Sequence, residues 1–282
     1  MITRDLDSFV DGDRSSTMPE GARAVECKHA LSRSKLPGLD YALNPYVGCG
    51  HDCIYCYAPF LMGKPRERWR TPVGARTNLP RLLDSELRKA SGTIGLGTVT
   101  DPYQPVEATL KLTRRCLEVI QRRGAHISIH TKSDLVLRDV DILMLLPEPE
   151  VGVTLTTIDE TLARTFEPFA PAPSARLNAI RGLVEADIRT YVLIGPIIPT
   201  VTDSNIEDLV RAISSTGVER VMLDRLRLRP GMLEYLSGLE GLRTEQGRKF
   251  LDRMSDQVYC SAAEMNLAKE LQRNRIVVEH AF

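Results

Sequence analysis

The sequence has no net charge and no long apolar stretch. Across 282 residues, 37 basic side chains balance 37 acidic ones. This balance does not favour extended binding to nucleic acid or to an anionic membrane. The longest apolar runs, such as YVLIGPII, are too short to cross a bilayer, and the first residues carry too many charges for a secretion signal. We therefore expect a cytoplasmic, monomeric protein without a membrane partner.

Disulfide bonds are also not expected, because cytosolic thiols are kept reduced. Three of the six cysteines nevertheless lie within eight residues, in the stretch NPYVGCGHDCIYCYAP. They are Cys49, Cys53 and Cys56, and the other three are scattered along the chain without a second closely spaced pair. The cluster therefore needs an explanation other than a disulfide.

Apolar runs that are typical of strands alternate with longer helical patterns along most of the chain. There is no internal repeat and no low-complexity segment. Six strand–helix pairs in this order predict parallel strands joined by right-handed crossovers. Because a closed eight-unit barrel usually needs more residues, we predict an α/β fold with a partial, open (β/α)6 barrel of the TIM type. The predicted strands are 43–47, 93–100, 126–131, 152–157, 190–196 and 218–223, and the predicted helices are 79–90, 106–123, 135–146, 174–186, 204–214 and 243–257. The barrel domain is expected to span residues 39–258, between an N-terminal extension (1–38) and a C-terminal extension (259–282).

The cysteine cluster directly follows the first predicted strand. In barrels of this type the chemistry takes place at the carboxyl ends of the strands, so this position favours a functional role over packing. A structural zinc ion generally takes four protein ligands, and His51 could complete such a set. Thiolates also hold iron–sulfur clusters, and three cysteines would leave one iron of a [4Fe–4S] cluster open to another ligand.

The spacing Cys49-x3-Cys53-x2-Cys56, with Tyr55 before the last cysteine, resembles the signature of the radical S-adenosylmethionine (SAM) superfamily. The resemblance implies a [4Fe–4S] cluster on the three cysteines and SAM on the open iron. One electron from the cluster would cleave SAM and yield a 5′-deoxyadenosyl radical. The resemblance also implies an external electron donor related to flavodoxin or ferredoxin. Under this interpretation His51 is a loop residue and not a ligand.

Longer segments resemble the spore photoproduct lyase-like branch of that superfamily. They include GTVTDPYQPVE, HTKSDLVLRD, VTLTTIDETLARTFEPFAPAPSARLNAI and LIGPIIPTVTDS, and together they extend over roughly residues 41–223. The resemblance implies that groups at the second strand end receive the amine of SAM, and that Lys132 and Thr154 receive its carboxylate. The implied cofactor-binding residues are Tyr55, Gly97, Thr98, Thr100, Lys132 and Thr154.

These residues also have ordinary structural explanations. The glycine and threonines at the second strand end suit a turn before Asp101 and Pro102. Lys132 suits a solvated position beside a helix cap at Ser133. Thr154 belongs to a residue type that is common in strands. The residues alone leave both interpretations open.

Three arginines are candidates for substrate binding. Arg176 either binds an anion near the barrel mouth or pairs with Glu167. Arg225 and Arg227 alternate in the segment LDRLRLRP and would share one face if it is extended. Guanidinium groups suit phosphates and carboxylates, which makes a nucleotide or nucleic acid a possible substrate. A solvated surface row is an equal alternative.

No motif identifies a hydrogen-atom donor. Spore photoproduct lyase uses a cysteine near the second strand end, and alignment on Thr100 and Asp101 places Thr98 there. Because an alcohol O–H group donates a hydrogen atom less readily than a thiol, repair of thymine dimers by that route is not expected. Tyr103 and Cys260 are the remaining candidates.

Two classes of function follow from these patterns. The main hypothesis is a radical SAM enzyme, related to the lyases, that abstracts hydrogen from an unidentified substrate. The alternative is a zinc-stabilised nucleic-acid-binding protein without catalysis, which would use His51 as a ligand and the arginine row as a contact surface. The sequence does not select the final reaction of the enzyme.

Overall fold

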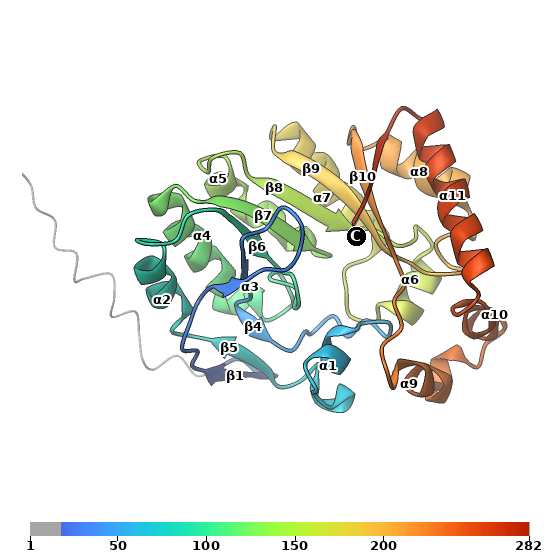
Figure 1. Ribbon diagram of the computed structural model, residues 1–282, viewed down its shortest axis with the longest axis horizontal. Helices are drawn as coiled ribbons and strands as arrows, with labels where there is room; N and C mark the ends of the chain where they lie inside the picture. Colours follow the sequence, from blue (N-terminus) through green and yellow to red (C-terminus); the bar gives the residue numbers. More distant parts are fainter. Residues whose placement is uncertain (1–17, 282) are drawn as a thin grey trace, which may run out of the picture.

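The computed structural model describes residues 18–281, and its centre is a curved, mostly parallel sheet (Figure 1). The strand order is β11-β10-β9-β8-β7-β6-β3-β2. Within the described residues, β2 pairs antiparallel and the other strands of this sheet pair in parallel. The predicted open α/β barrel is therefore confirmed. The strands are β2 (Ser32–Arg33), β3 (Tyr41–Leu43), β6 (Thr93–Leu96), β7 (His126–Thr131), β8 (Glu150–Thr154), β9 (Arg189–Ile197), β10 (Arg220–Arg225) and β11 (Val277–His280).

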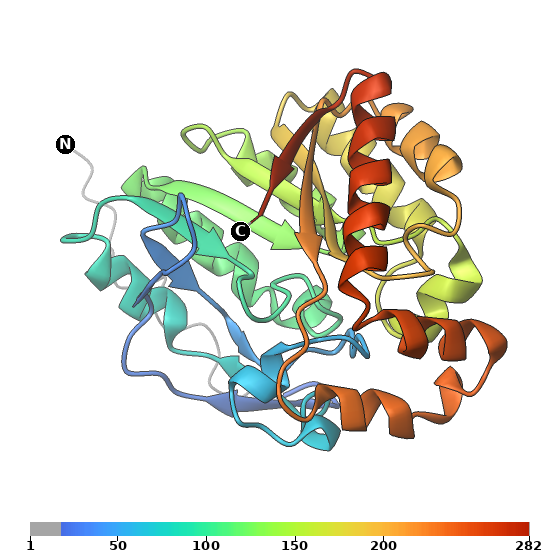
Figure 2. The same ribbon diagram turned by 45° about the vertical axis from the view of Figure 1, so that its right-hand side comes forward.

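Helices cover one face of this sheet (Figures 1 and 2). Alternate residues of the strands point to that face, and they are apolar and buried beneath the helices. On β7 these residues are Ile127 and Ile129, and on β8 they are Val151 and Val153. The residues between them face the concave side. The covering helices are α2 (Leu79–Glu86), α4 (Leu112–Arg123), α5 (Val140–Leu143), α7 (Pro173–Glu185), α8 (Ile206–Ser214) and α11 (Gln257–Arg273). Shorter helices lie in the connections: α6 (Glu160–Phe166), α9 (Met232–Gly238) and the 3-10 helix η4 (Glu240–Leu242).

Two predicted helices are interrupted. The helix predicted over 106–123 divides into α3 (Glu107–Leu110) and α4, because Lys111 between them adopts a left-handed φ of 50°. The helix predicted over 135–146 begins as a 3-10 helix, η3 (Asp134–Asp139), and continues as the short α5. Both predictions were correct in position but wrong in continuity.

The C-terminal part of the chain adds one more helix and strand to the barrel. The helix predicted over 243–257 is α10 (Glu245–Arg253), and α11 begins where the side chain of Asp256 accepts hydrogen bonds from its first N–H groups. β11 then pairs in parallel with β10 and extends the sheet beyond the six predicted strands (Figure 2). The predicted start of the C-terminal extension, residue 259, falls within α11. No helix of the described residues has the length and apolar character needed to cross a membrane.

A small second sheet lies beside the barrel. Its order is β1 (Ala22–Val25), β5 (Val73–Arg76) and β4 (Tyr46–Val47). The strand predicted over 43–47 is divided between the two sheets, with its start in β3 and its end in β4. Pro45 separates the two parts because it has no N–H to donate to a strand ladder. Between β4 and β5 lie α1 (Ala58–Leu61) and the 3-10 helix η2 (Arg66–Arg68). Of the predicted N-terminal extension, residues 1–17 lie outside the described part of the chain.

The end of α4 allows a clean test of backbone strain. Gly124 has a φ of 64°, and an added Cβ would meet no atom within 4 Å. We expect Gly124→Ala to lower the free energy of unfolding by about 1 kcal/mol, because a left-handed backbone is strained for any residue with a Cβ. Urea denaturation measures the change. Gly238→Ala in α9 also places its Cβ in open space but without a positive φ, and it should be neutral or stabilising. Equal losses in both variants would contradict this explanation.

Candidate active site

The three clustered cysteines lie in one loop between β4 and α1. Cys53 is buried, and Cys49 and Cys56 are half-buried. Burial raises the pKa of all three thiols, that of Cys49 to about 12, and the neighbouring cysteines add to the effect at Cys49 and Cys53. The free thiols are therefore protonated at neutral pH. A bound metal centre would displace these protons, because only thiolates act as metal ligands.

Hydrogen-bond donors and a positive charge surround these sulfur atoms. The backbones of Asp101 and His51 lower the pKa of the Cys49 thiol and so oppose the effect of burial. The Lys132 ammonium opposes the effect of burial on the pKa of Cys53. Hydrogen bonds to sulfur and nearby charge stabilise the thiolates of iron–sulfur clusters and tune them. The residues present therefore fit a cluster that is held by three cysteines.

Gln104 fixes the backbone of the cysteine loop. Its side chain is fully buried. The amide oxygen accepts from the N–H of Gly50 at 2.8 Å, and the amide nitrogen donates to the carbonyl of Gly48 at 3.2 Å. Gly48 has a φ of 88°, and an added Cβ would lie 2.5 Å from the carbonyl oxygen of Trp69. Glycine is required there by both conformation and space.

Asp101 joins the loop to the carboxyl ends of β6 and β7. One carboxylate oxygen accepts from the hydroxyl of Thr131 at 2.7 Å and from the N–H of Tyr103 at 2.9 Å. The other accepts from the N–H of Lys132 at 2.7 Å and lies 3.3 Å from Nδ1 of His51. Burial alone would raise the pKa of Asp101, but His51 and the hydrogen-bond donors lower it to about 2. Asp101 is therefore an ionised hub beneath the loop.

His51 is buried, and its Nδ1 is directed at Asp101. Within residues 18–281, no three Cys, His, Asp or Glu side chains converge on a single metal-ion position. A four-iron cluster does not need such convergence, because each thiolate binds its own iron. The position of Nδ1 agrees with a loop role for His51.

Glu167 is a second buried anchor of the loop. Its carboxylate accepts a short hydrogen bond from the hydroxyl of Tyr55, and the Thr156 hydroxyl donates to it at 3.3 Å. Arg176 forms an ion pair with it, at 2.5 Å between Nη2 and Oε2. Burial works against ionisation of Glu167, but the positive charges of Arg176 and Lys132 hold its pKa below the ordinary value. Two anionic anchors, Asp101 and Glu167, thus hold the loop.

Sequence comparison places this site in a known superfamily. Residues 43–213 match the profile of the Radical SAM superfamily. The chain belongs to this superfamily. An uncharacterized protein of Methanocaldococcus jannaschii is 39% identical over 184 residues, which cover 64% of this chain and 68% of that protein. An uncharacterized protein of Mycobacterium bovis is 34% identical over 221 residues, or 73% of this chain and 65% of its own length. The matched segments span about two thirds of these relatives.

Solved structures of several proteins have the same fold. A tyrosine-to-phenylalanine mutant of spore photoproduct lyase has a TM-score of 0.70 at 13% identity, over 92% of this chain and 81% of that one. The lyase complexed with dinucleoside spore photoproduct has a TM-score of 0.62 at 14% identity, over 91% and 81%. Streptococcus suis SuiB bound to SAM has a TM-score of 0.56 at 12% identity, over 85% and 49%. At these identities the likeness establishes the fold alone.

Several predicted SAM-binding residues of this radical SAM chain gather beside the cysteine loop. The Nζ of Lys132 lies 5.8 Å from the ring centre of Tyr55. Thr154 is buried, and its carbonyl accepts from Nη1 of Arg176 at 3.3 Å. Of the two alternatives for Arg176, the structure therefore has the ion pair with Glu167. The roles of Lys132, Tyr55 and Thr154 toward SAM stay predictions.

The predicted residues at the end of β6 form a tight turn. An added Cβ at Gly97 would lie 2.3 Å from the carbonyl oxygen of His130, so only glycine fits there. The hydroxyl of Thr98 accepts from the amide of Asn44 at 3.2 Å. Thr100 is buried, and its hydroxyl donates to a carbonyl of β4 at 3.2 Å. These groups serve the turn, and their contact with SAM stays a prediction.

The two candidate hydrogen donors lie away from this group. Tyr103 is buried in the barrel wall, and the guanidinium carbon of Arg138 lies 5.9 Å from the centre of its ring. Burial raises the pKa of its hydroxyl most, and the charge of Asp139 raises it further. Cys260 lies in α11, and its sulfur is 3.6 Å from the carbonyl oxygen of Arg253. The structure does not bring either side chain to the cysteine loop.

Arg225, the last residue of β10, and Arg227 beyond it are exposed and take part in ion pairs. Arg225 pairs with Glu264 of α11, and Arg227 lies 3.3 Å from Asp224. Both are near the carboxyl end of β10. Their role in substrate binding stays a prediction.

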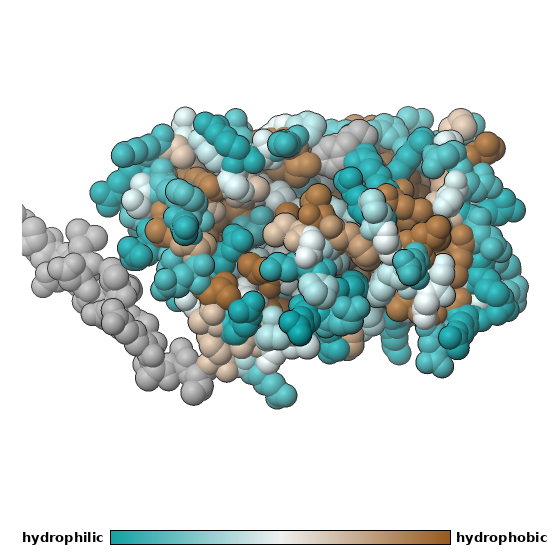
Figure 3. Space-filling model, turned by 60° about the horizontal axis from the view of Figure 1, so that its bottom comes forward, coloured by the Kyte–Doolittle hydropathy of each residue, from teal (hydrophilic) through white to brown (hydrophobic). Residues whose placement is uncertain are grey.

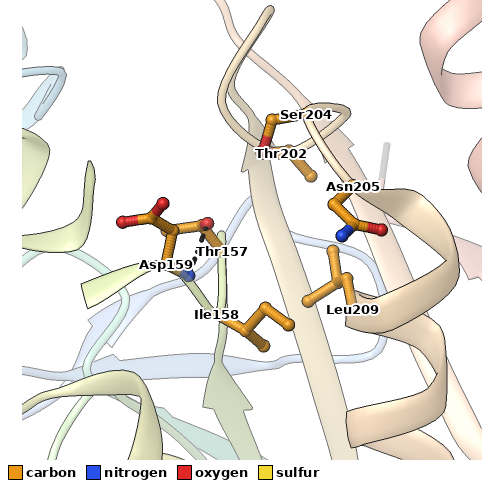
Figure 4. A pocket seen from close by; sticks show the side chains of 7 residues that line it. All are labelled: Thr157, Ile158, Asp159, Thr202, Ser204, Asn205 and Leu209. Carbon is orange, nitrogen blue, oxygen red and sulfur yellow. Dashed lines mark hydrogen bonds between the residues drawn. The ribbon is translucent and has the colours of Figure 1, made fainter. Parts of the chain in front are cut away.

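A cavity of about 250 Å³ lies at the same edge of the sheet (Figure 4). It separates the loop after β8 from the start of α8. The Thr157 hydroxyl accepts from the N–H of Asp159 at 3.1 Å, and the Ser204 hydroxyl donates to Val201 at 2.7 Å. These polar groups therefore stabilise the loops around the cavity. The lining residues are Thr157, Ile158, Asp159, Thr202, Ser204, Asn205 and Leu209.

Two anchors of the cysteine loop, Gln104 and Asn44, were not predicted from the sequence. The side-chain oxygen of Asn44 accepts from the N–H of Val99 at 3.1 Å, which ties the start of the loop to the end of β6. The available signal was a polar residue five positions before Cys49 and another three positions after Asp101. Their partners lie more than fifty residues away, so spacing did not identify them.

Proposed function

We propose that the chain is an enzyme that forms a 5′-deoxyadenosyl radical and abstracts a hydrogen atom from a substrate. The observation that carries this proposal is the loop of three clustered thiols, anchored by Asp101 and Glu167 and facing Lys132. Cys49, Cys53 and Cys56 would hold a [4Fe–4S] cluster, which when bound supplies one electron for the cleavage of SAM into methionine and the radical. This role agrees with the superfamily of the chain.

The residues around the loop would bind and orient SAM. Two positive charges, Lys132 and Arg176, face the single negative charge of Glu167. Arg176 forms the ion pair with Glu167, whereas the Lys132 ammonium lies near the ring of Tyr55 beside the cysteine loop, where it suits the carboxylate of the methionyl part. Burial in the same place strengthens such a charge interaction, because less water screens it.

For the substrate we propose a molecule with anionic, nucleotide-like groups. Burial, Cys56 and Asp224 raise the pKa of Tyr57, and the charges of Arg229 and Arg227 oppose this rise. Tyr57 itself is 40% exposed and directly follows Cys56. An aromatic ring beside guanidinium groups suits a base with its phosphates. A threonine at position 98 supports a final reaction other than thiol-dependent lesion repair.

For the electron donor we propose an acidic flavodoxin- or ferredoxin-like protein that docks beside α1. Leu61 and Met62 are 55% and 44% exposed, and the exposed Lys64 and Arg68 follow them. Figure 3 looks on to the face that carries α1 and α9, where apolar residues lie among hydrophilic ones. Basic groups around an apolar centre suit an acidic partner, and this surface directly follows the last cysteine.

Reconstitution tests the proposed function. Anaerobic loading with iron and sulfide should give a coloured protein with about four irons per chain. Addition of SAM and dithionite should then release 5′-deoxyadenosine, and omission of either reagent should abolish it. Metal analysis and chromatography provide the measurements. A colourless protein with tightly held zinc and salt-sensitive binding to RNA or DNA would contradict the proposal and support the zinc alternative.

A further inference from the structure

The segment after α6 is attached to the cysteine loop through its backbone. The N–H of Ile54 donates to the carbonyl of Phe166 at 2.9 Å, and the N–H of Phe169 donates to the carbonyl of His51 at 3.3 Å. Glu167 lies between these two points and accepts from the hydroxyl of Tyr55. The loop that carries the thiols thus has its position set by a segment that follows β8.

Arg176 of α7 fixes this segment to β8. Its Nε donates to the carbonyl of Pro171 at 2.8 Å, and its Nη1 donates to the carbonyl of Thr154 at 3.3 Å. Its Nη2 lies 2.5 Å from Glu167. A planar guanidinium holds these three acceptors in a fixed geometry, which a lysine cannot do. Glu167 is therefore locked relative to Thr154, a residue predicted to contact SAM.

The two charged side chains are only 1–2% exposed, which argues against a role in packing alone. Burial of an ion pair has a desolvation cost, and an apolar pair of similar size would often be as stable. The charged pair provides what an apolar pair lacks, namely an acceptor for Tyr55 and a fixed negative charge that faces Lys132. Tyr55 and Lys132 are both predicted to bind SAM, and the Nζ of Lys132 lies 5.8 Å from the ring centre of Tyr55.

We propose that the Glu167–Arg176 ion pair is a positioning element. It sets Tyr55 and Lys132, and with them the cysteine loop, against the end of β8 so that SAM fits between them. This inference rests on the proposed function. It assigns a role toward the cofactor to two residues that do not ligate the cluster and that lie more than a hundred residues from the cysteine motif.

Glu167→Gln keeps the shape of the side chain and removes its charge. Reconstituted Glu167→Gln should retain the iron content of the wild type but bind SAM about 10-fold or more weakly, as expected for loss of a supporting interaction. Equilibrium dialysis measures the affinity. The change in the electron paramagnetic resonance spectrum of the reduced cluster on addition of SAM gives a second readout that does not depend on turnover.

A double-mutant cycle tests whether Glu167 acts through Tyr55. If it does, Tyr55→Phe and Glu167→Gln should together weaken SAM binding by about the same factor as either change alone. Losses that multiply would overturn this part of the proposal. Arg176→Lys keeps the charge but not the fork, and it should weaken binding in the same way. This variant serves if Glu167→Gln does not fold.

Glu107→Gln is the matched control. Glu107 is also fully buried, pairs with Arg138 at 2.7 Å and accepts from a tyrosine hydroxyl, that of Tyr46. Its replacement should lower thermal stability and leave the affinity for SAM unchanged. The proposal is overturned if Glu167→Gln behaves like this control. If the wild-type protein itself holds no iron and binds no SAM, the proposed function has failed instead.

Discussion

Replacing Cys53 with alanine should remove the cluster and bring SAM cleavage down to background. With one of three thiolates lost, bound iron should fall from about four to less than one per chain. The fold should persist, because Gln104, Asp101 and Glu167 anchor the loop without using the Cys53 sulfur. Iron analysis, visible absorbance and circular dichroism of the reconstituted variant provide the measurements.

Cys116→Ala is the control for this result. Cys116 is a fully buried thiol in the core cluster of α4, away from the cysteine loop. Its loss should cost about 1 kcal/mol of unfolding free energy through reduced apolar burial, and iron content and SAM cleavage should match the wild type. A Cys53→Ala protein with a full complement of iron would show that this thiol is not a ligand.

Asp101→Asn should lower the free energy of unfolding by about 3–5 kcal/mol, because it removes one partner of a buried, hydrogen-bonded charge. In the wild type, donors approach both carboxylate oxygens of Asp101. In the variant, an NH2 group replaces one of these oxygens, so on that side a donor faces a donor. Thr131, Lys132 and His51 would each lose an anionic partner. Urea denaturation of the apo-protein under reducing conditions at pH 7 measures the change.

The same carboxylate makes the wild type sensitive to acid in a defined range. The pKa of Asp101 falls from an ordinary value near 3.9 to about 2 in the folded protein. Stability from its charge, about 2.5 kcal/mol, is therefore present above pH 4 and lost as the pH falls toward 2. Asp84→Asn, which breaks a surface pair with Arg123, should cost at most about 1 kcal/mol. Equal costs for the two variants at pH 7 would refute the hub role of Asp101.

Local pattern predicted those elements whose burial is periodic. The strand predicted over 126–131 is β7, because Ile127 and Ile129 alternate with residues of the concave face. β11 was missed because it is short and none of its residues is buried, so its sequence carries no such contrast. The break at Lys111 was missed because a left-handed residue inside a helical pattern has no signal in hydrophobic periodicity.

The site shows the same limit more sharply. The spacing of Cys49, Cys53 and Cys56 is a local property, and it predicted the superfamily correctly. The partners of the loop are not local, since Tyr55 and Glu167 are 112 residues apart in sequence. Glu167 contacts both Tyr55 and Arg176 because of the way β8, α6 and α7 pack. No spacing rule contains that information.

The long-range anchors of the cysteine loop also have a consequence for the newly made protein. Gly50 meets Gln104, which is 54 residues later in the chain, and Tyr55 needs a residue 112 positions later. The thiols therefore leave the ribosome well before the groups that shield them have been synthesised. During that interval the loop lacks the two hydrogen-bond partners that later hold it. Its final geometry is therefore completed only after the segment that follows β8 has been made.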